Sequence, residues 1–326
     1  MHPALSSILR LSTKKNEEKL NILTFSTHER YQSNMADINA NFWLIDTENT
    51  KKWNYKYAEI PKNHHLLNDI NEIKDIPLYI EFDAVLSQNR FFQFHSAKKM
   101  AEYLNIPLIC LEHTEMIDGR QKFKKFKGDL NIFISEFSAK SWEPDYDYHI
   151  IEHGINTSVF HNKNFKKEQN VLSVVNNWIE RDNECGFYFW KEITENFKTK
   201  VIGNTPNLSM PAKNVNDLVN FYNRSAVFLN TSIKSPLPMT LLEAMSCGCC
   251  VVSTENEMIS KVIKNEENGF ISNDKNKLIN YINMCLNDKN LNYEIGKKAR
   301  ETILNNYSLE KFTNSWNNIL NSTLRK

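Results

Sequence analysis

Short apolar runs alternate with longer stretches of helical spacing along the first half of the chain. In the stretch RFFQFHSAKKMAEYLNI, apolar residues recur every three or four positions on one face, and Pro107 then ends the predicted helix. Runs rich in β-branched and aromatic residues, which favour strands, surround it at residues 21–26, 41–46, 77–88, 108–113 and 127–135. Strands that alternate with helices of this length predict right-handed βαβ units and a parallel sheet.

The same alternation begins again after a polar, basic stretch at residues 157–169. Strand-like and helical runs then follow in turn at residues 170–175, 186–197, 199–203, 214–225 and 226–232. We therefore predict an α/β protein with two Rossmann-like domains, residues 1–157 and 158–305, and an interdomain cleft. A last helix within residues 306–326 is expected to pack back across the domains through Leu309, Phe312, Trp316 and Leu320.

Composition and charge exclude several classes of protein. A chain of 326 residues with 41% hydrophobic and 24% charged residues is typical of a soluble globular protein. Its net charge of +1 gives no bulk attraction for a polyanion, and no apolar run approaches the ~18 residues of a membrane span. The N-terminus does not read as a secretory signal, so we expect a cytoplasmic protein.

The numbers and positions of the glycines and cysteines exclude further classes of protein. None of the eight glycines precedes Gly119, and neither G-x-G-x-x-G nor G-x-x-x-x-G-K-[ST] occurs, which argues against a dinucleotide oxidoreductase or a P-loop kinase. Six cysteines in so long a chain do not indicate a disulfide framework. Cys247, Cys249 and Cys250 crowd together, but no second Cys/His pair follows at zinc spacing, so we expect apolar fillers and no metal site.

The segment SPLPMTLLEAMSCGCCVVST places a single carboxylate, Glu243, inside an otherwise apolar helix. Pro238 suits the first turn of that helix, and Gly248 suits the position after its end. A buried carboxylate needs a partner, because burying it unpaired costs several kcal/mol. Glu243 either meets a basic or backbone donor inside the protein or faces a crevice and accepts hydrogen bonds from a ligand. The second alternative is favoured, because the helix begins at the carboxyl end of a parallel sheet, where ligands bind and free N–H groups attract phosphate.

The same segment resembles the donor-site signature of retaining glycosyltransferases with the GT-B fold, of the family 4 type, which reads E-x-F-G-x-x-x-x-E-A-M-A-C-G-x-P-V-V. Four more segments resemble parts of that family's sequence and occur in the expected order: NIPLICLEH, DLNIFISEFSAKSW, HIIEHGINTSVF and AVFLNTS. The resemblance runs from about residue 78 onward and is strongest in the second domain.

The resemblance implies how a nucleotide sugar would be bound. Glu243 would accept hydrogen bonds from the ribose hydroxyls. The diphosphate would be bound by the backbone amides just before it, those of Met239, Thr240 and Leu241, since Pro238 has no amide. A nucleotide diphospho-sugar would be the donor substrate, and no further cofactor is expected.

The remaining site residues follow from position in the resembled segments. His113 is expected in the interdomain cleft as a catalytic residue, although a lone histidine at a strand end more often has a structural role. Asn177 and Gly203 are donor-side candidates, and Glu112 is a weaker acceptor-side candidate.

Three departures from the family pattern bear on activity. The first glutamate of the signature is Ser235, which can donate to a sugar hydroxyl but cannot stabilise a developing positive charge. The usual arginine–lysine pair after the first strand of the second domain leaves Arg181 as the cation for the diphosphate, with a catalytic role. The first-domain loop, STHERYQS, contains no glycine, so His28 and Arg30 would contact the acceptor side with their side chains.

A basic run, GRQKFKKFKGD, interleaves lysines with two phenylalanines. Phe123 and Phe126 are three residues apart, which predicts a surface helix with two apolar anchors. The alternative is a peripheral contact with an anionic surface or acceptor through Lys122, Lys124, Lys125 and Lys127.

The leading hypothesis is a retaining, metal-independent glycosyltransferase that moves a sugar from a nucleotide diphospho-sugar to a glycan, lipid-linked or other acceptor. The first rival is a non-catalytic nucleotide-sugar or glycan-binding protein of the same fold, which the change at Ser235 favours. The second rival is a glycosyltransferase acting on modified DNA bases, against which the modest net charge counts.

Overall fold

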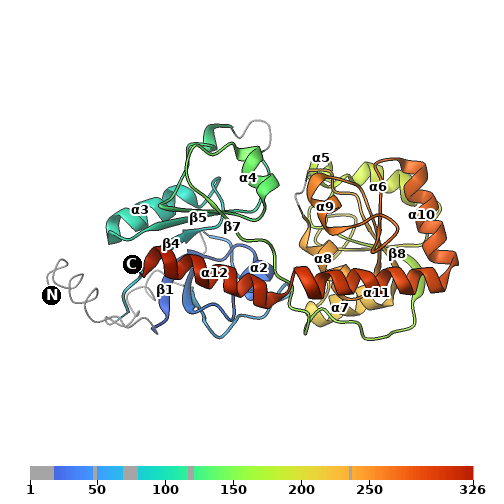
Figure 1. Ribbon diagram of the computed structural model, residues 1–326, viewed down its shortest axis with the longest axis horizontal. Helices are drawn as coiled ribbons and strands as arrows, with labels where there is room; N and C mark the ends of the chain where they lie inside the picture. The colour runs from blue at the N-terminus through green and yellow to red at the C-terminus, as the bar shows by residue number, and fades with distance from the viewer. Residues whose placement is uncertain (1–17, 47–49, 69–79, 117–120, 235–236, 326) are drawn as a thin grey trace.

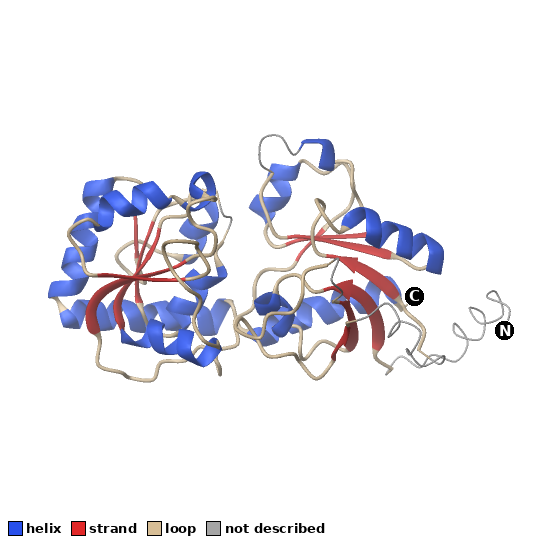
Figure 2. Ribbon diagram, turned by 180° about the vertical axis from the view of Figure 1, so that it is seen from behind, coloured by secondary structure: helices blue, strands red, loops and turns tan. Residues whose placement is uncertain are grey.

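The computed structural model describes residues 18–46, 50–68, 80–116, 121–234 and 237–325, which form two α/β domains side by side (Figure 1). Helices cover both faces of the sheet in each domain (Figure 2). Successive residues of a central strand therefore face different apolar clusters: Ile22 packs against one face of the first sheet and Leu23 against the other.

The N-terminal domain contains a seven-stranded, all-parallel sheet. Its strands lie in the order β3 (His64–Leu67), β2 (Ala40–Ile45), β1 (Leu20–Phe25), β4 (Ala84–Ser87), β5 (Leu108–Glu112), β6 (Leu130–Phe133) and β7 (His149–Ile150). Its helices are α2 (Glu29–Ser33), α3 (Phe94–Leu104) and α4 (Glu136–Trp142), with a 3₁₀ turn, η1, at Gln121–Phe123. All residues of β4, β5 and β6 are buried, as expected for parallel strands covered on both faces.

The C-terminal domain contains a five-stranded parallel sheet. Its strands lie in the order β12 (Phe270–Ile271), β11 (Cys250–Ser253), β10 (Ser225–Asn230), β8 (Glu168–Val174) and β9 (Thr199–Ile202). Its helices are α5 (Asp182–Cys185), α6 (Phe187–Thr194), α7 (Val215–Arg224), α8 (Met239–Ser246), α9 (Glu257–Val262), α10 (Lys275–Asn287) and α11 (Lys289–Asn306). The strand order reverses between β8 and β10 in this sheet and between β1 and β4 in the first. Such switch points are where open α/β sheets bind ligands.

The last helix, α12 (Leu309–Leu324), returns from the C-terminal domain and packs on the N-terminal sheet (Figure 1). The indole of Trp316 is fully buried there and donates a hydrogen bond to the hydroxyl of Tyr31, 3.2 Å away. The chain thus crosses between the domains twice. The crossings meet where the amide of Ile155 donates to the carbonyl of Tyr307, 2.9 Å away.

Most strands predicted from the sequence are present within a few residues of the expected positions, but the short strands β3, β7 and β12 were not predicted and one predicted helix is absent. The pattern did not reveal β3, whose sequence HHLL has only two apolar residues. The helix expected in the basic run is wrong, because its described residues form only η1 and a following loop. Phe123 and Phe126 still lie near each other, with ring centroids 5.5 Å apart, because a 3₁₀ turn also brings residues three apart together.

Candidate active site in the interdomain cleft

A pocket of about 320 Å³ lies where the carboxyl edges of the two sheets face each other. The N-terminal wall comes from segments that follow β1, β2, β5 and β7, and the C-terminal wall from segments that follow β8 and β9 and from the start of α8. The predicted site residues in its lining are His28, Arg30, His113, Gly203, Met239, Thr240 and Glu243.

The first turn of α8 points two free backbone donors at this pocket. Neither the amide of Met239 nor that of Thr240 has a hydrogen-bond partner among the described residues. The amide of Leu241 already donates to the carbonyl of Pro238, 3.1 Å away, so it is not available to a ligand. Free amides and the positive end of the helix dipole make this turn a site for an anion.

Glu243, one turn further along α8, is buried and engaged on both oxygens. Its Oε1 pairs with Nη1 of Arg30 at 2.5 Å, and its Oε2 accepts from the hydroxyl of Tyr222 at 2.8 Å. Burial raises the pKa of Glu243, and the nearby Arg30 opposes this shift. The buried carboxylate therefore has a cationic partner, Arg30, which belongs to the other domain. This ion pair joins the two walls of the pocket.

Arg30 is fixed in place by contacts besides the ion pair. Its Nε donates to the carbonyl of Tyr57 at 2.7 Å, and its guanidinium lies over the ring of Phe160, 5.0 Å from the centroid. The short helix α2 directs it into the cleft at the position where the resembled family has a glycine-rich loop.

Three histidines and Tyr31 line the N-terminal wall. The ring of His113 lies 4.6 Å from those of His28 and Tyr31, and the ring of His153 lies 5.8 Å from Tyr31. Burial lowers the pKa of His153 to about 4 and lowers that of His113, to which His28 and His153 also contribute. Both rings are therefore neutral at pH 7. Nε2 of His113 and Nδ1 of His153 have no hydrogen-bond partner among the described residues, so each can take one from a ligand.

Gly203 lets the backbone turn sharply at the C-terminal wall. Its φ of +138° is open to glycine, and a Cβ there would lie 2.0 Å from the carbonyl oxygen of Val175. The amide of Asn204 then donates to Oδ1 of Asn176, 2.8 Å away, which keeps Asn176 at the pocket.

Other predicted site residues lie outside the pocket lining. Arg181 is exposed and pairs with Glu184 at 3.1 Å, although its charge still contributes to lowering the pKa of His28. Asn177 is exposed beside it. The carboxylate of Glu112 is buried within the N-terminal domain, 3.8 Å from the guanidinium of Arg90. Leu241 is buried in the core, and Ser235 lies outside the described residues.

Several residues of the site were not predicted from the sequence, among them Tyr31 and His153 on the N-terminal wall. Lys51 and Tyr57 come from the connection after β2, where no motif singles them out. Asn176 immediately precedes the candidate Asn177, and Tyr222 lies on the buried face of α7 with its hydroxyl against Glu243. The apolar spacing of α7 signals the burial of Tyr222 but not its partner.

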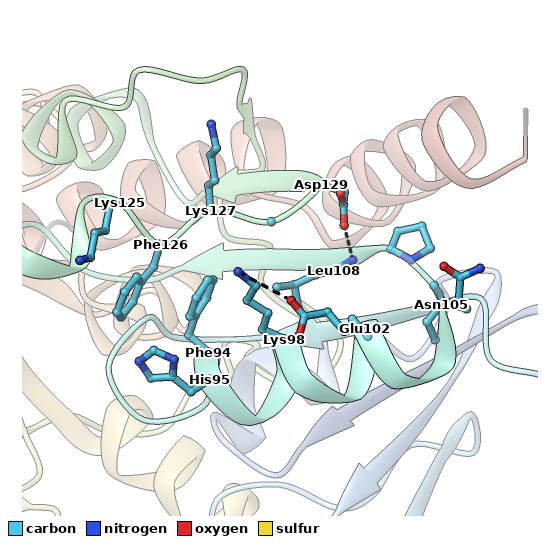
Figure 3. Close-up of a pocket in the computed structure, with 14 residues that line it drawn as sticks. Phe94, His95, Lys98, Glu102, Asn105, Leu108, Lys125, Phe126, Lys127 and Asp129 are labelled. Carbon is cyan, nitrogen blue, oxygen red and sulfur yellow. Dashed lines mark hydrogen bonds and ion pairs between the residues drawn. The ribbon is translucent and has the colours of Figure 1, made fainter.

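A second hollow, of about 830 Å³, lies away from the cleft between α3 and the loop before β6 (Figure 3). Phe126 stacks on Phe94 at its edge with centroids 4.6 Å apart, while Lys125 and Lys127 flank it. The ammonium of Lys124 instead pairs with Glu143 at 2.5 Å.

Comparison with solved structures identifies the fold. A sucrose-phosphate synthase from Thermosynechococcus elongatus aligns over 93% of this chain and 99% of its own, with a TM-score of 0.72 and 13% identity. Anabaena HepE in complex with UDP and glucose aligns over 94% of this chain and 100% of its own, with a TM-score of 0.70 and 13% identity. The chain has the GT-B fold.

Sequence comparison shows similarity to known proteins over a shorter stretch of this GT-B chain, mainly in its C-terminal half. Residues 203–302 match the family described as glycosyl transferases group 1. A trehalose synthase of Pyrococcus horikoshii is 31% identical over 144 residues, 43% of this chain and 34% of that protein. A UDP-Gal:alpha-D-GlcNAc-diphosphoundecaprenol alpha-1,3-galactosyltransferase of Escherichia coli is 35% identical over 99 residues, 29% of this chain and 25% of that protein. The matches thus span about a third or less of those two relatives.

Two features are absent from the described residues of this GT-B chain. None of its helices combines the length and the apolar character that crossing a bilayer requires. Within those residues, no cluster of three or more histidine, cysteine, aspartate or glutamate side chains could hold a metal ion.

Proposed function

We propose that this protein is a glycosyltransferase that uses a nucleotide diphospho-sugar as donor and retains the configuration of the transferred sugar. The observation that carries the proposal is the juxtaposition, in one interdomain pocket, of the free amides of Met239 and Thr240 with the carboxylate of Glu243. The UDP complex of HepE, a protein of the same fold, supports a nucleotide donor.

The donor would bind against α8. The diphosphate would accept hydrogen bonds from the amides of Met239 and Thr240, and the ribose hydroxyls would donate to Glu243. Since Arg30 occupies Oε1 of Glu243, the nucleotide must share or displace that contact.

The transfer step would take place beneath the histidine wall. The acceptor oxygen would bond to the anomeric carbon on the face that the diphosphate leaves, while the carbon–phosphate oxygen bond breaks. The proton of the acceptor hydroxyl would pass to the departing diphosphate. Neutral His113 would accept a hydrogen bond from the donor sugar through Nε2, so it would position the sugar. The helix N-terminus would stabilise the charge on the leaving group.

The test compares two substitutions at one position. Met239→Pro removes the amide, and the backbone accepts it because Pro238 already has the extended ψ of 126° that precedes proline. Met239→Ala removes the same side chain and keeps the amide. A thermal-shift panel of nucleotide sugars first identifies the donor, and calorimetry then measures affinity.

We expect Met239→Pro to weaken binding of the nucleoside diphosphate by about tenfold or more relative to Met239→Ala, the value of a hydrogen bond to a charged group. Affinity for the free nucleoside should be equal in the two variants. Equal affinity of both variants for the diphosphate would exclude the amide site. Product analysis by NMR then tests retention, and an inverted anomer would exclude it.

A non-catalytic nucleotide-sugar-binding protein is the second candidate. It is favoured by the commitment of both oxygens of Glu243 to protein partners and by the pairing of Arg181 with Glu184. Donor binding without transfer or hydrolysis across an acceptor panel would support it over the enzyme.

The acceptor side would face an anionic surface. Lys125 and Lys127 flank the hollow beside α3, and Phe92, just before α3, and Tyr103, on α3, are 89% and 90% exposed. Exposed aromatic rings together with lysines suit a lipid–water interface. Vesicles with and without an anionic phospholipid test this: Lys125→Glu/Lys127→Glu should reduce co-sedimentation, and Lys191→Glu on α6 should not. Equal reduction by both would exclude a localised patch.

A further inference from the structure

A third hollow, of about 620 Å³, lies in the C-terminal domain between α11 and residues 157–169, the interdomain connector. It shares no lining residue with the cleft pocket. Five cationic side chains and one carboxylate, that of Glu301, line it. The cations are Lys166, Lys167, Lys289, Lys297 and Arg300. None of these five cations forms an ion pair with any residue in the described part of the chain.

Lys167 carries the argument, because its ammonium group is buried and has no hydrogen-bond partner among the described residues. Its charge also acts on Cys249, which follows the lining residue Gly248: burial raises the pKa of Cys249, and the charge of Lys167 opposes that shift. A buried ammonium without a partner is costly, so the site favours an anion that would neutralise it.

The remaining lining narrows the kind of anion. Arg300 is held by the carbonyl of Ser246, at the end of α8, and by that of Phe160, 3.3 Å away, so its position is fixed. The rings of Phe165 and Tyr293 stand partly exposed at the rim, where they can cover an organic group. The volume lies within the range of small-molecule sites and far exceeds that of a single phosphate ion.

We propose that this hollow is a second binding site, separate from the cleft, for a small organic phosphate. The phosphate would contact Lys167 and Arg300 at the floor, and the organic part would lie between Phe165 and Tyr293. The ligand would thereby bridge the connector and α11, which carry the two crossings of the chain between domains.

Fructose 1,6-bisphosphate and ribose 5-phosphate are suitable probes, because each joins a phosphate to an organic group and neither carries a nucleobase. Calorimetry should show saturable binding of at least one probe, and fructose should not bind. Lys297→Glu should weaken that binding tenfold or more. Lys298→Glu changes the net charge equally at an exposed neighbour outside the lining, and it should alter binding less than twofold. Equal losses in both variants, or no saturable binding of any probe, would overturn the proposal.

Lys167→Met separates a ligand-binding role from a structural one. We expect it to abolish probe binding without lowering the thermal midpoint of the free protein, because it removes an unpaired buried charge and keeps the apolar stem. A lower midpoint with unchanged binding would show that the ammonium serves the fold and would overturn the proposal. The nucleoside diphosphate from the cleft test should bind Lys167→Met as it binds the wild type, so failure of either site is recognised separately.

Discussion

At the scale of a single residue, Glu243 combines three properties. It is buried, it is bonded to side chains from both domains, and it lies one turn from two free amides. A carboxylate needs this support to remain charged inside the protein, since burial raises its pKa and Arg30 opposes the shift.

Glu243→Gln tests the ribose contact at this residue. The amide keeps the shape of the side chain and loses the charge, so the affinity for the nucleoside diphosphate should fall by ~1.5–3 kcal/mol, the range for hydrogen bonds to charged groups. Calorimetry gives the value, and Glu257→Gln on the exposed part of α9 is the control. Unchanged affinity in a folded Glu243→Gln protein would leave the carboxylate with a structural role alone.

His153 gives the protein an acid-sensitive stability. Its pKa is about 4 in the folded protein against 6.5 in an unfolded chain, so between those values the unfolded chain binds more protons and acidification favours unfolding. The full effect, reached below pH 4, is about 3 kcal/mol. The urea midpoint of His153→Asn should therefore fall less than that of the wild type between pH 7 and pH 4.5. The raised pKa values of Glu112 and Glu243 act in the opposite direction in both proteins and cancel in the comparison. Parallel pH profiles would contradict the prediction.

At the scale of elements, α8 lies between the cleft and α11. The turn after α8 approaches α11 closely: a Cβ on Gly296 would lie 2.4 Å from the carbonyl oxygen of Gly248. The contact is between backbones, which cannot shift as the end of a flexible side chain can.

Gly296→Ala should lower the stability of the C-terminal domain. Alanine favours a helix over glycine by ~1 kcal/mol, but the clash forces α11 away from the turn after α8, and overpacking of this kind costs ~1–3 kcal/mol. The expected result is a lower thermal midpoint, measured by calorimetry, while Glu294→Ala on the exposed face of α11 should have little effect. A higher midpoint would mean that helix propensity outweighs the clash.

The elements that sequence reasoning could predict were those with local signals. Pro238 and Gly248 bound an apolar run of helical length, so α8 could be placed to within a residue or two. The four-residue β3 has little apolar character of its own and is defined by its pairing with β2. The helix predicted for the basic run was wrong because the spacing of Phe123 and Phe126 also fits a 3₁₀ turn.

The candidate site was harder to predict because its contacts are distant in sequence. The need for a partner of Glu243 followed from burial, but Arg30 lies 213 residues away in the chain, and no local pattern joins the two. His113 was placed by a family resemblance and lies in the pocket, whereas Glu112, its neighbour on the strand, points inward to Arg90. Alternation along a strand predicts opposite faces but not which face meets the cleft.

At the scale of the whole molecule, two features set how the domains are related. The chain crosses between them at Ile155 and at Tyr307, and the ion pair of Arg30 with Glu243 joins them across the pocket. The crossings allow one domain to rotate relative to the other, whereas the ion pair holds the domains in one relative position. Opening the cleft must therefore break the ion pair.

Arg30→Met tests this closed position. The substitution keeps most of the apolar stem and removes the charge, so the free protein should be more open, with a larger radius of gyration in X-ray scattering. The affinity for the nucleoside diphosphate should rise, because the nucleotide no longer has to displace Arg30 from Oε1 of Glu243. Arg224→Met, in the C-terminal domain, is the matched control. An unchanged radius and affinity would show that Arg30 does not restrain the cleft.

The position of α12 has a consequence for biosynthesis. Phe312, Trp316 and Leu320 fill the core of the N-terminal domain, so this domain lacks part of its interior until α12 has been synthesised. The C-terminal domain draws its own core from residues that are complete before α12 emerges. The half that is made second is therefore able to finish folding first, and the half that is made first must wait, partly exposed, on the nascent chain.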